Sequence, residues 1–534
     1  MLSLSAALLS LAFSSFNFYF FAWIGLVPLF FALEDKNKLQ AFLLSYACGF
    51  LFFAFSMYWL IHVSIIGWVV LSLYQAIYFG AFGLLHSHHV TKSQSHQSAS
   101  TIDHRPLTID YLALSSAWVL LEYLRAHLFG GIGWNLLGYS QYQNLPIIQI
   151  ADIAGVWGVS FLVILLNITV YNVIKMAINC YRADSNFKIK TGTFKQELKN
   201  HPTAQVLVVV ILFALSLAYG YSVLGTIKTT GHPSADSLFK ISVIQGNIPQ
   251  KQKWDERFQK NIMDTYEELT LQASKDEPQL IIWPETAVPG YLNYEEGLMQ
   301  WLKRVVNNSQ TQVLVGAPVV GENNIETLYN SALLFSKEFK LIEQYNKLHL
   351  VALGEFVPFE KQFPWLRKFF PITGAFSSGK EYTIFNLQTI DHRPLTIDFS
   401  TLICYEDIFP GLVRQFVKKG ANFMVNMTND AWFGKTCAAY QHGACSVLRA
   451  VENRTSFVRS ANTGLSCFID KTGRIYDKVS KNGRDLFVSG IKTANVPIFK
   501  AERPSIYTKY GDIFILICLF LSALGLAAKK VLTK

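Results

Sequence analysis

The stretch Thr401-Leu402-Ile403-Cys404-Tyr405-Glu406-Asp407 decides the fold of the second half of this chain. An apolar run typical of a β-strand ends at a cysteine, and polar residues follow at once. Two other segments share this pattern, because 280–283 runs into Glu285 and 341–345 runs into Lys347. Open α/β sheets place their active sites where strands end and loops begin. A thiol, a carboxylate and an ammonium at three such ends can supply a nucleophile, a general base and an oxyanion stabiliser.

The composition divides the chain into a membrane part and a soluble part. Of its 534 residues, 51% are hydrophobic and only 16% are charged, whereas soluble domains carry about 25% charged residues. The apolar residues are concentrated toward the two ends of the chain. We therefore expect a membrane domain with seven helices at 1–224, a soluble α/β domain at 225–505, and an eighth transmembrane helix with a basic tail at 506–534.

Eight apolar stretches are the candidate transmembrane helices. They lie at 2–16, 18–33, 41–62, 65–86, 110–129, 156–178, 204–224 and 511–528. If the eight alternate, the basic loops after the second, fourth and sixth stretches and the basic tail fall on one side. The positive-inside rule makes that side cytoplasmic and puts 225–510 outside. The N-terminus lacks a basic region and a small-residue cleavage site, so we expect a retained first helix.

Charge and cysteine content exclude several classes of function. The net charge of +10 comes from residues clustered in the loops between apolar stretches, which does not indicate nucleic-acid binding. The seven cysteines include no CxxC pair and no zinc-type spacing, so neither a disulfide framework nor a structural metal site is expected. One decapeptide recurs identically at 101–110 and 389–398. We interpret it as an insertion tolerated in loops, in preference to a functional motif.

The soluble segment alternates short apolar runs with longer amphipathic stretches, as βα units do. Strands are predicted at 241–244, 280–283, 312–315, 328–335, 339–345, 399–404, 423–426, 456–460, 465–469 and 485–490. Helices are predicted at 254–274, 295–308, 407–419 and 438–453. A segment of this length can bury its own core.

Each of the three strand-end residues also has an ordinary interpretation. A cysteine at the end of a strand is commonly a core residue, a carboxylate there often begins a helix, and a lone lysine is commonly solvated. The abrupt polar sequence after Cys404 argues against a core cysteine. The tight turn around Glu285 and the apolar residues after Lys347 likewise favour one shared site.

An ordered set of motifs extends over essentially the whole chain. They are Leu137–Gln141, Gln245–Gln250, Trp283–Glu285, Tyr345–Lys347, Gly354–Pro358, Ile403–Glu406 and Asn429–Gly434. This set resembles the apolipoprotein N-acyltransferase family, the membrane branch of the carbon–nitrogen hydrolase (nitrilase) superfamily. The chain departs from the family pattern at Phe356, where the family has Tyr, and at 435–439, which lacks the usual acidic and Gly-Pro positions.

The resemblance implies a multi-span α-helical membrane domain joined to an α/β domain with a nitrilase-like αββα sandwich. It implies that Glu285 is the general base, Lys347 the oxyanion stabiliser and Cys404 the acylated nucleophile. Further implied residues are Glu355, Tyr405 and Glu406, which support the active site, and Trp254 and Trp432, which contact substrate. The resemblance implies no metal and no cofactor.

The family's reaction moves an acyl chain from a phospholipid, through a cysteine thioester, to the N-terminal amine of an S-diacylglyceryl-cysteine apolipoprotein. This completes lipoprotein maturation. The implied partners are therefore a phospholipid donor, a diacylglyceryl apolipoprotein acceptor and the membrane, with no nucleic acid. The resemblance also implies a multi-pass monomer in the bacterial inner (cytoplasmic) membrane, with its catalytic domain facing the periplasm.

One alternative stays open at this point, a membrane-tethered nitrilase-type amidase with water as the acceptor. A scaffold that keeps the fold without activity is disfavoured, because the carboxylate, the ammonium and the thiol are all present in order. A transporter is disfavoured, because Glu122 and Arg125 lie toward one end of their stretch and form no mid-span charge pair.

A set of aromatic residues in the soluble segment has two possible roles, which are to bind lipid or to pack in a core: Phe356, Phe359, Phe363, Trp365, Phe369 and Phe370.

Overall fold

The chain divides into two units, which are described separately. The computed structural model describes residues 1–16, 18–94, 108–185, 203–229, 238–321, 324–352, 354–357, 360, 362–365, 376–388, 396–498 and 504–532. The helical unit comprises Met1–Thr226 and Asp512–Lys534, and the sandwich unit comprises Ile227–Gly511.

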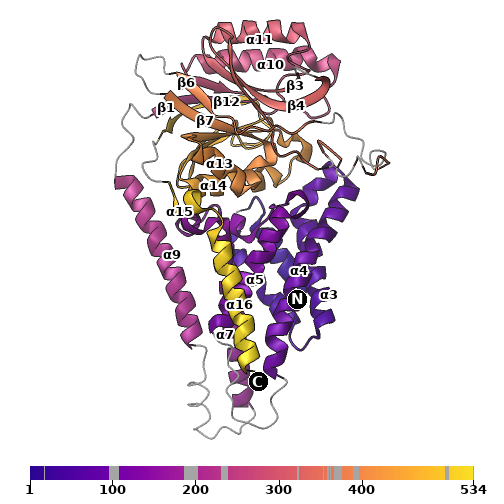
Figure 1. Ribbon diagram of the computed structural model, residues 1–534, viewed down its shortest axis with the longest axis vertical. Helices are drawn as coiled ribbons and strands as arrows, with labels where there is room; N and C mark the ends of the chain where they lie inside the picture. Colours follow the sequence, from indigo (N-terminus) through magenta and orange to yellow (C-terminus); the bar gives the residue numbers. More distant parts are fainter. Residues whose placement is uncertain are drawn as a thin grey trace. The chain divides into compact units, whose positions relative to one another are not determined.

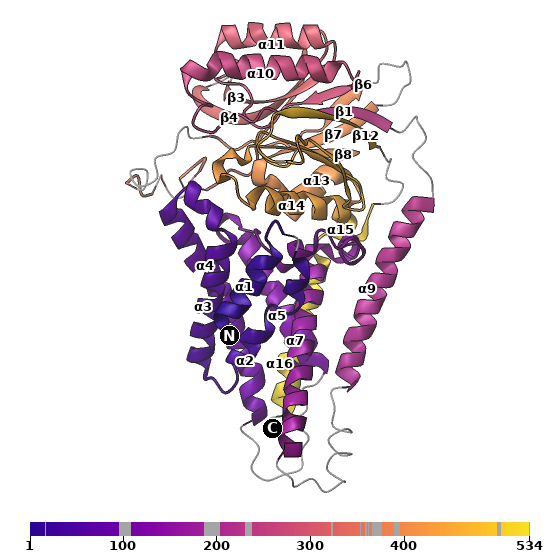
Figure 2. The same cartoon turned by 180° about the vertical axis from the view of Figure 1, so that it is seen from behind.

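The helical unit is built from apolar helices of unequal length (Figures 1 and 2). Its elements are α1 (Leu2–Ala12), η1 (Tyr19–Trp23), α2 (Val27–Ala32), α3 (Lys38–Ser56), η2 (Tyr58–His62), α4 (Ile65–Gln94), α5 (Thr108–His127), η3 (Leu128–Gly130), η4 (Leu137–Gln141), α6 (Leu145–Ile148), α7 (Ala151–Ser185), α9 (Thr203–Thr229) and α16 (Ile513–Leu532). Within the described ranges, four helices are long and apolar enough to cross a membrane: Lys38–Ser56, Ile65–Ser87, Ala151–Asn179 and Gln205–Thr226. The chain is a membrane protein.

Two of the predicted stretches are each divided between two elements. The stretch 18–33 forms η1 and then α2, which has Pro28 in its first turn, where a missing N–H costs no hydrogen bond. The stretch 41–62 forms α3 and then η2. At the start of α3, the Asn37 side chain accepts a hydrogen bond from the Gln40 N–H, and the Gln40 side chain accepts one from the Asn37 N–H. This reciprocal pair fixes where the helix begins.

The sandwich unit contains two six-stranded sheets. The first has the order β12-β1-β2-β3-β4-β5, and the second has the order β11-β10-β9-β8-β7-β6. The strands of the first are β1 (Leu238–Gln245), β2 (Leu280–Ile282), β3 (Gln312–Gly321), β4 (Asn324–Phe335), β5 (Leu341–Asn346) and β12 (Gly490–Pro497). Those of the second are β6 (Phe385–Gln388), β7 (Thr396–Ile403), β8 (Phe423–Thr428), β9 (Ser456–Ala461), β10 (Cys467–Ile469) and β11 (Ile475–Lys478).

Helices cover the outer faces of both sheets. Figure 1 shows α10 (Glu256–Ser274) and α11 (Glu296–Ser309) over the first sheet, and α13 (Pro410–Lys418) and α14 (Ala438–Asn453) over the second. The predicted αββα sandwich is therefore confirmed. The central strands β1, β2 and β3 run parallel, as do β7, β8 and β9. Strands buried on both faces read as continuous apolar runs, which is why they were visible in the sequence.

The two sheets are joined by polar contacts as well as by apolar packing. The Ser460 hydroxyl on β9 lies 3.1 Å from both the Ile244 carbonyl oxygen on β1 and the Ile282 carbonyl oxygen on β2. Residues that follow the strands also meet across the sandwich, since the Glu285 carboxylate after β2 accepts a hydrogen bond from the Asn429 N–H after β8.

Some predicted elements differ from the structure. The strand predicted at 485–490 is wrong, because Phe487 has a φ of 55°, which an extended strand does not adopt. The strands nearby are β11 and β12 instead. The helix predicted at 407–419 is divided into η6 (Cys404–Ile408) and α13, which begins at Pro410. Strand β6 was not predicted. Only the last three residues of each copy of the decapeptide lie within the described ranges.

Candidate active site

Cys404 stands at the turn between β7 and η6, in a backbone conformation that is rare for residues other than glycine. Its φ is 58°, in the left-handed region. Burial and the negative charge of Glu285 raise the pKa of the Cys404 thiol well above its ordinary value, while Lys347 acts in the opposite direction. The resting thiol therefore carries its proton, and it needs a neighbouring base to become a nucleophile.

Glu285 follows β2 and presents a carboxylate whose two oxygens are both held. Its Oε1 accepts a hydrogen bond from Asn330 Nδ2 at 2.8 Å, and its Oε2 accepts one from the Asn429 N–H at 2.9 Å. The turn is tight, since Thr286 has a φ of 44°, and a Cβ at Gly316 would overlap the carbonyl of residue 284. The carboxylate is buried and oriented, as a general base must be.

Lys347 follows β5, and its ammonium lies between two carboxylates. Its Nζ donates to Glu355 Oε1 at 2.9 Å and lies 3.6 Å from Glu285 Oε1. Burial alone would lower the pKa of Lys347, but the charges of Glu355 and Glu285 raise it well above the ordinary value. The buried ammonium stays protonated and can stabilise a developing oxyanion.

Glu355 links the base and the ammonium through shared partners. Its Oε2 accepts a hydrogen bond from the Val351 N–H at 2.8 Å, which fixes the carboxylate. The amide of Asn330 also lies 3.2 Å from Glu355 Oε1, so one side chain bridges Glu285 and Glu355. The position of Lys347 beside Glu285 therefore depends on Glu355.

Glu406 and Tyr405 tie the nucleophile's strand end to the loop after Lys347. Glu406 is fully buried and accepts hydrogen bonds from the N–H groups of Ile403, Leu348 and His349 at 2.7, 2.8 and 2.9 Å. Burial raises the pKa of Glu406 to about 7. The Tyr405 hydroxyl donates to the carbonyl oxygen of residue 350, and its ring centroid lies 5.6 Å from Lys347 Nζ. Both residues hold the backbone next to Cys404 and Lys347 in place.

The two tryptophans assigned to substrate lie on the surface. Trp254 and Trp432 are 47% and 44% exposed, and each follows a chain segment that contacts Glu285. Phe356, Phe363 and Trp365 are exposed as well, so these three do not pack in a core. The other aromatic residues of that set lie outside the described residues: Phe359, Phe369 and Phe370.

Three residues around Glu285 were missed by sequence reasoning. Asn330 and Asn429 hold the carboxylate, and Lys253 Nζ donates to the Glu285 backbone carbonyl at 2.9 Å. Burial lowers the pKa of Lys253 to about 8, although Glu285 opposes the change. The position of Asn330 just before the apolar end of β4 signals a buried polar side chain, but it does not indicate the partner of that side chain.

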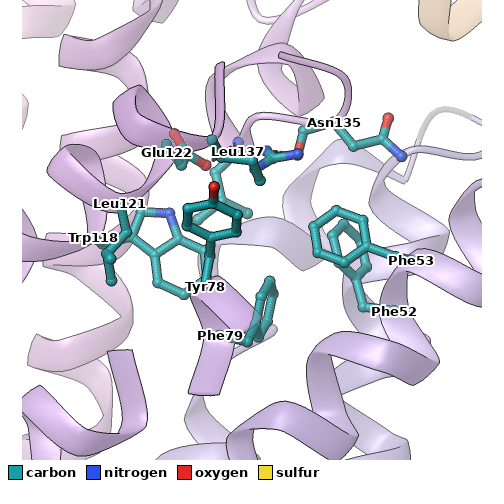
Figure 3. A pocket seen from close by; sticks show the side chains of 10 residues that line it. Phe52, Phe53, Tyr78, Phe79, Trp118, Leu121, Glu122, Asn135 and Leu137 are labelled. Carbon is teal, nitrogen blue, oxygen red and sulfur yellow. Dashed lines mark hydrogen bonds between the residues drawn. The ribbon is translucent and has the colours of Figure 1, made fainter. Parts of the chain in front are cut away.

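A pocket lies in the helical unit (Figure 3). It is lined by Phe52, Phe53, Tyr78, Phe79, Trp118, Leu121, Glu122, Arg125, Asn135 and Leu137. Glu122 Oε1 accepts a hydrogen bond from the Leu137 N–H at 2.8 Å, and Arg125 donates to the Trp134 carbonyl at 2.7 Å. Both charged side chains therefore hold backbone of the chain after α5. In the part of the chain that the structure describes, no group of three His, Cys, Asp or Glu side chains could hold a metal ion.

The arrangement in the sandwich unit suits chemistry at an acyl carbon. A thiol, an oriented carboxylate and a buried ammonium act on one another, as the influence of Glu285 and Lys347 on the Cys404 thiol indicates. This set can form and break a bond from sulfur to a carbonyl carbon. The sandwich unit is a carbon–nitrogen hydrolase domain, and the carbon-nitrogen hydrolase family matches residues 240–497.

The first part of the chain narrows this class to one family. The apolipoprotein N-acyltransferase N-terminal domain matches residues 5–169. A protein from Geobacter metallireducens described as apolipoprotein N-acyltransferase is 35% identical over 96% of this chain and 92% of its own length. One from Chlorobaculum tepidum is 29% identical over 93% of this chain and 89% of its own. An amidase from Nesterenkonia sp. with a solved structure is 18% identical, with a TM-score of 0.38, and covers 52% of this chain and 97% of its own.

The chain belongs to the apolipoprotein N-acyltransferase family. It is an acyltransferase with a membrane-embedded helical part.

Proposed function

We propose that the protein transfers an acyl chain from a phospholipid to the N-terminal amine of an S-diacylglyceryl-cysteine apolipoprotein, through a thioester on Cys404. The observation that carries the proposal is the convergence of three strand ends. Lys347 Nζ lies 3.6 Å from Glu285 Oε1, and both charges act on the Cys404 thiol. Family membership supports a lipoprotein acceptor.

In the first half-reaction, the Cys404 sulfur attacks the ester carbonyl carbon of the phospholipid, and Glu285 takes the thiol proton. The Lys347 ammonium stabilises the negative charge that forms on the carbonyl oxygen. The ester C–O bond then breaks, and Glu285 returns the proton to the leaving lysophospholipid oxygen. The acyl chain remains on Cys404 as a thioester.

In the second half-reaction, the uncharged N-terminal amine of the apolipoprotein attacks the thioester carbonyl. Glu285 takes a proton from the attacking nitrogen and gives it to the sulfur as the C–S bond breaks. The products are an amide and the free thiol of Cys404. Division into two steps lowers each barrier, because the thioester is a more reactive acyl donor than the phospholipid ester.

The surroundings of the site suit a lipid donor. Trp254, Trp432, Phe356 and Trp365 expose aromatic surface within the sandwich unit, and aromatic rings are favoured where apolar and aqueous regions meet. We propose that the enzyme is a monomer in the bacterial inner membrane with its sandwich unit in the periplasm. The basic loops between the apolar stretches support this orientation.

The test is the intact mass of the full-length enzyme after incubation with a phospholipid of one defined acyl chain. We expect a gain of one acyl group that hydroxylamine removes. Among the six cysteines whose side chains the structure describes, only Cys404 and Cys437 are partly exposed. Cys404→Ser should therefore abolish the adduct, and the matched variant Cys437→Ser should keep it.

A synthetic diacylglyceryl-cysteinyl peptide then distinguishes transfer from hydrolysis. Transfer discharges the thioester and increases the mass of the peptide by one acyl group. Release of free fatty acid at the same rate with and without the peptide would instead identify an amidase-like hydrolase. An active enzyme whose mass does not change, or an adduct that persists in Cys404→Ser, would refute the thioester.

A further inference from the structure

A buried cluster of four charged side chains lies behind the nucleophile and takes no part in the steps above. Its members are Asp407 on η6, Asp430 on η7 (Asp430–Phe433), His442 on α14 and Arg459 on β9. Each is at most 2% exposed. Two carboxylates and two cations give the cluster no net charge when His442 is protonated, which is how buried charges are tolerated.

His442 is surrounded by acceptors. Its Nδ1 lies 2.9 Å from Asp430 Oδ1, and its Nε2 lies 3.1 Å from Asp407 Oδ1. The Nε2 is also 3.2 Å from the Cys404 carbonyl oxygen. A neutral imidazole has one N–H, so one ring nitrogen would direct a lone pair at an oxygen. The geometry therefore favours the imidazolium, which donates from both nitrogens.

The electrostatic surroundings of His442 agree with this geometry. Burial alone would lower the pKa of His442, but Asp407 and Asp430 raise it to about 9, even though the positive Arg459 opposes them. Arg459 Nη1 lies 2.9 Å from Asp407 Oδ2, and it also donates to the Ser446 hydroxyl at 2.7 Å. The ring is thus fixed on both sides by carboxylates that are themselves held.

The contact with Cys404 matters because that residue is strained. A residue other than glycine is strained in the left-handed region and stays there only when its surroundings fix it. The Cys404 carbonyl oxygen accepts two hydrogen bonds, one from His442 and one from Asn426 Nδ2 at 3.0 Å. These two donors fix the peptide plane that follows Cys404, and with it the direction of the thiol.

The Nδ1 side of the His442 ring is connected to Glu285, the proposed general base. Asp430, bound to His442 Nδ1, directly follows Asn429, whose N–H holds Glu285 Oε2 at 2.9 Å. The Thr428 hydroxyl lies 3.3 Å from Asp430 Oδ1, and hydrogen bonding by the Thr428 side chain acts to lower the pKa of the Cys404 thiol. One ring therefore connects the backbone of the nucleophile with the segment that contacts both the thiol and the general base.

We propose that His442 is a positioning residue: held between Asp407 and Asp430, it keeps the Cys404 thiol and the Glu285 carboxylate aligned for proton transfer. This inference rests on the proposed function only in its choice of nucleophile and base. Misplacement of reacting groups by about 1 Å costs on the order of 100-fold in rate, so the loss of this contact should slow the chemical step more than substrate binding.

The experiment uses His442→Gln in the full-length enzyme, since glutamine keeps a neutral donor but cannot hold two carboxylates as a cation does. Two rates are measured per folded molecule: thioester formation from phospholipid and alkylation of Cys404 by iodoacetamide. We expect both to fall about 10- to 100-fold, with KM for phospholipid unchanged. Alkylation needs no lipid, so it still reports on alignment if the proposed acyl transfer is wrong.

Two further variants keep the result interpretable. Asp407→Asn removes one charge that holds the ring while keeping a similar shape, and we expect a smaller loss of both rates. It serves as the test variant if His442→Gln does not fold. Cys445→Ala is the matched control, because Cys445 is buried on α14 beside His442, and its described hydrogen bond goes to the Gln441 carbonyl within the same helix. It should keep both rates.

Three results would overturn the proposal. The first is a folded His442→Gln enzyme with both rates unchanged. The second is a raised KM with unchanged kcat, which would make His442 a substrate-binding residue. The third is an equal loss of both rates in Cys445→Ala, which would mean that substitutions on α14 act only through general stability.

Discussion

Glu406 offers the sharpest test of how the site is held together. Its carboxylate accepts hydrogen bonds from three backbone N–H groups, those of Ile403, Leu348 and His349, and from the Tyr345 hydroxyl. In Glu406→Gln, the amide oxygen can keep the two N–H groups after Lys347. The amide NH2 then faces the Ile403 N–H, which loses its partner one residue before the nucleophile.

The expected magnitude follows from the number of unpaired donors. One buried N–H without a partner costs about 1–3 kcal/mol, and a change of 1 kcal/mol moves Tm by roughly 2–4 °C in a domain of this size. We therefore expect Glu406→Gln to lower Tm by roughly 2–12 °C. Glu406→Ala leaves three N–H groups without a partner and should cost about three times as much free energy.

The assay is thermal unfolding of the full-length enzyme in detergent, followed by tryptophan fluorescence, with thioester formation measured on the same samples. The decisive quantity is the ratio of the free energies of unfolding that the two variants lose. If Glu406→Ala is no less stable than Glu406→Gln, the three N–H contacts do not carry the stability assigned to them. If both variants keep the wild-type Tm but lose thioester formation, Glu406 takes part in the chemistry instead.

Three other predictions concern the base, the pH dependence and the orientation of the chain. Glu285→Gln should slow thioester formation about 10²–10⁴-fold and Lys347→Ala about 10²–10³-fold. A near-normal single-turnover rate in either variant would refute the role proposed for that residue. The pKa of His442 is raised from 6.5 to about 9, so its stabilising interactions are fully present below pH 6.5 and are lost as pH rises through about 9. Tm should fall over that range and fall less in His442→Gln, and parallel Tm curves would contradict this. A periplasm-dependent phosphatase should be active when fused near Asn293 and silent after Lys534, and the reverse pattern would overturn the proposed topology.

The strand ends could be read from the sequence because burial on both faces leaves a continuous apolar run that stops abruptly. This is why Glu285, Lys347 and Cys404 were identified as one group, and the structure brings them together. Asn330 and His442 were not identified, because a single polar residue in a strand or helix gives no sign of its partner. Their importance lies in contacts between distant segments, which no local pattern encodes.

The repeated decapeptide shows the same limit for secondary structure. Its last three residues, Thr-Ile-Asp, begin helix α5 at Thr108–Asp110 and strand β7 at Thr396–Asp398. The residues that follow decide the outcome, since β7 pairs with both β6 and β8. Local propensity is weaker than such pairing. The wrong strand at 485–490 has a similar cause, because the positive φ of Phe487 depends on its surroundings.

The distribution of the site over both sheets has a consequence for the newborn chain. Glu285 and Lys347 belong to the first sheet and Cys404 to the second. The first sheet also stays incomplete until β12 is made, because β12 pairs with β1 over eight residues. While the polypeptide is being synthesised, the thiol therefore emerges after its base but before the strand that completes the base's sheet. For the proposed reaction, this order means that an unfinished chain lacks a complete site, and reactivity is expected only when almost the whole polypeptide has been synthesised and folded.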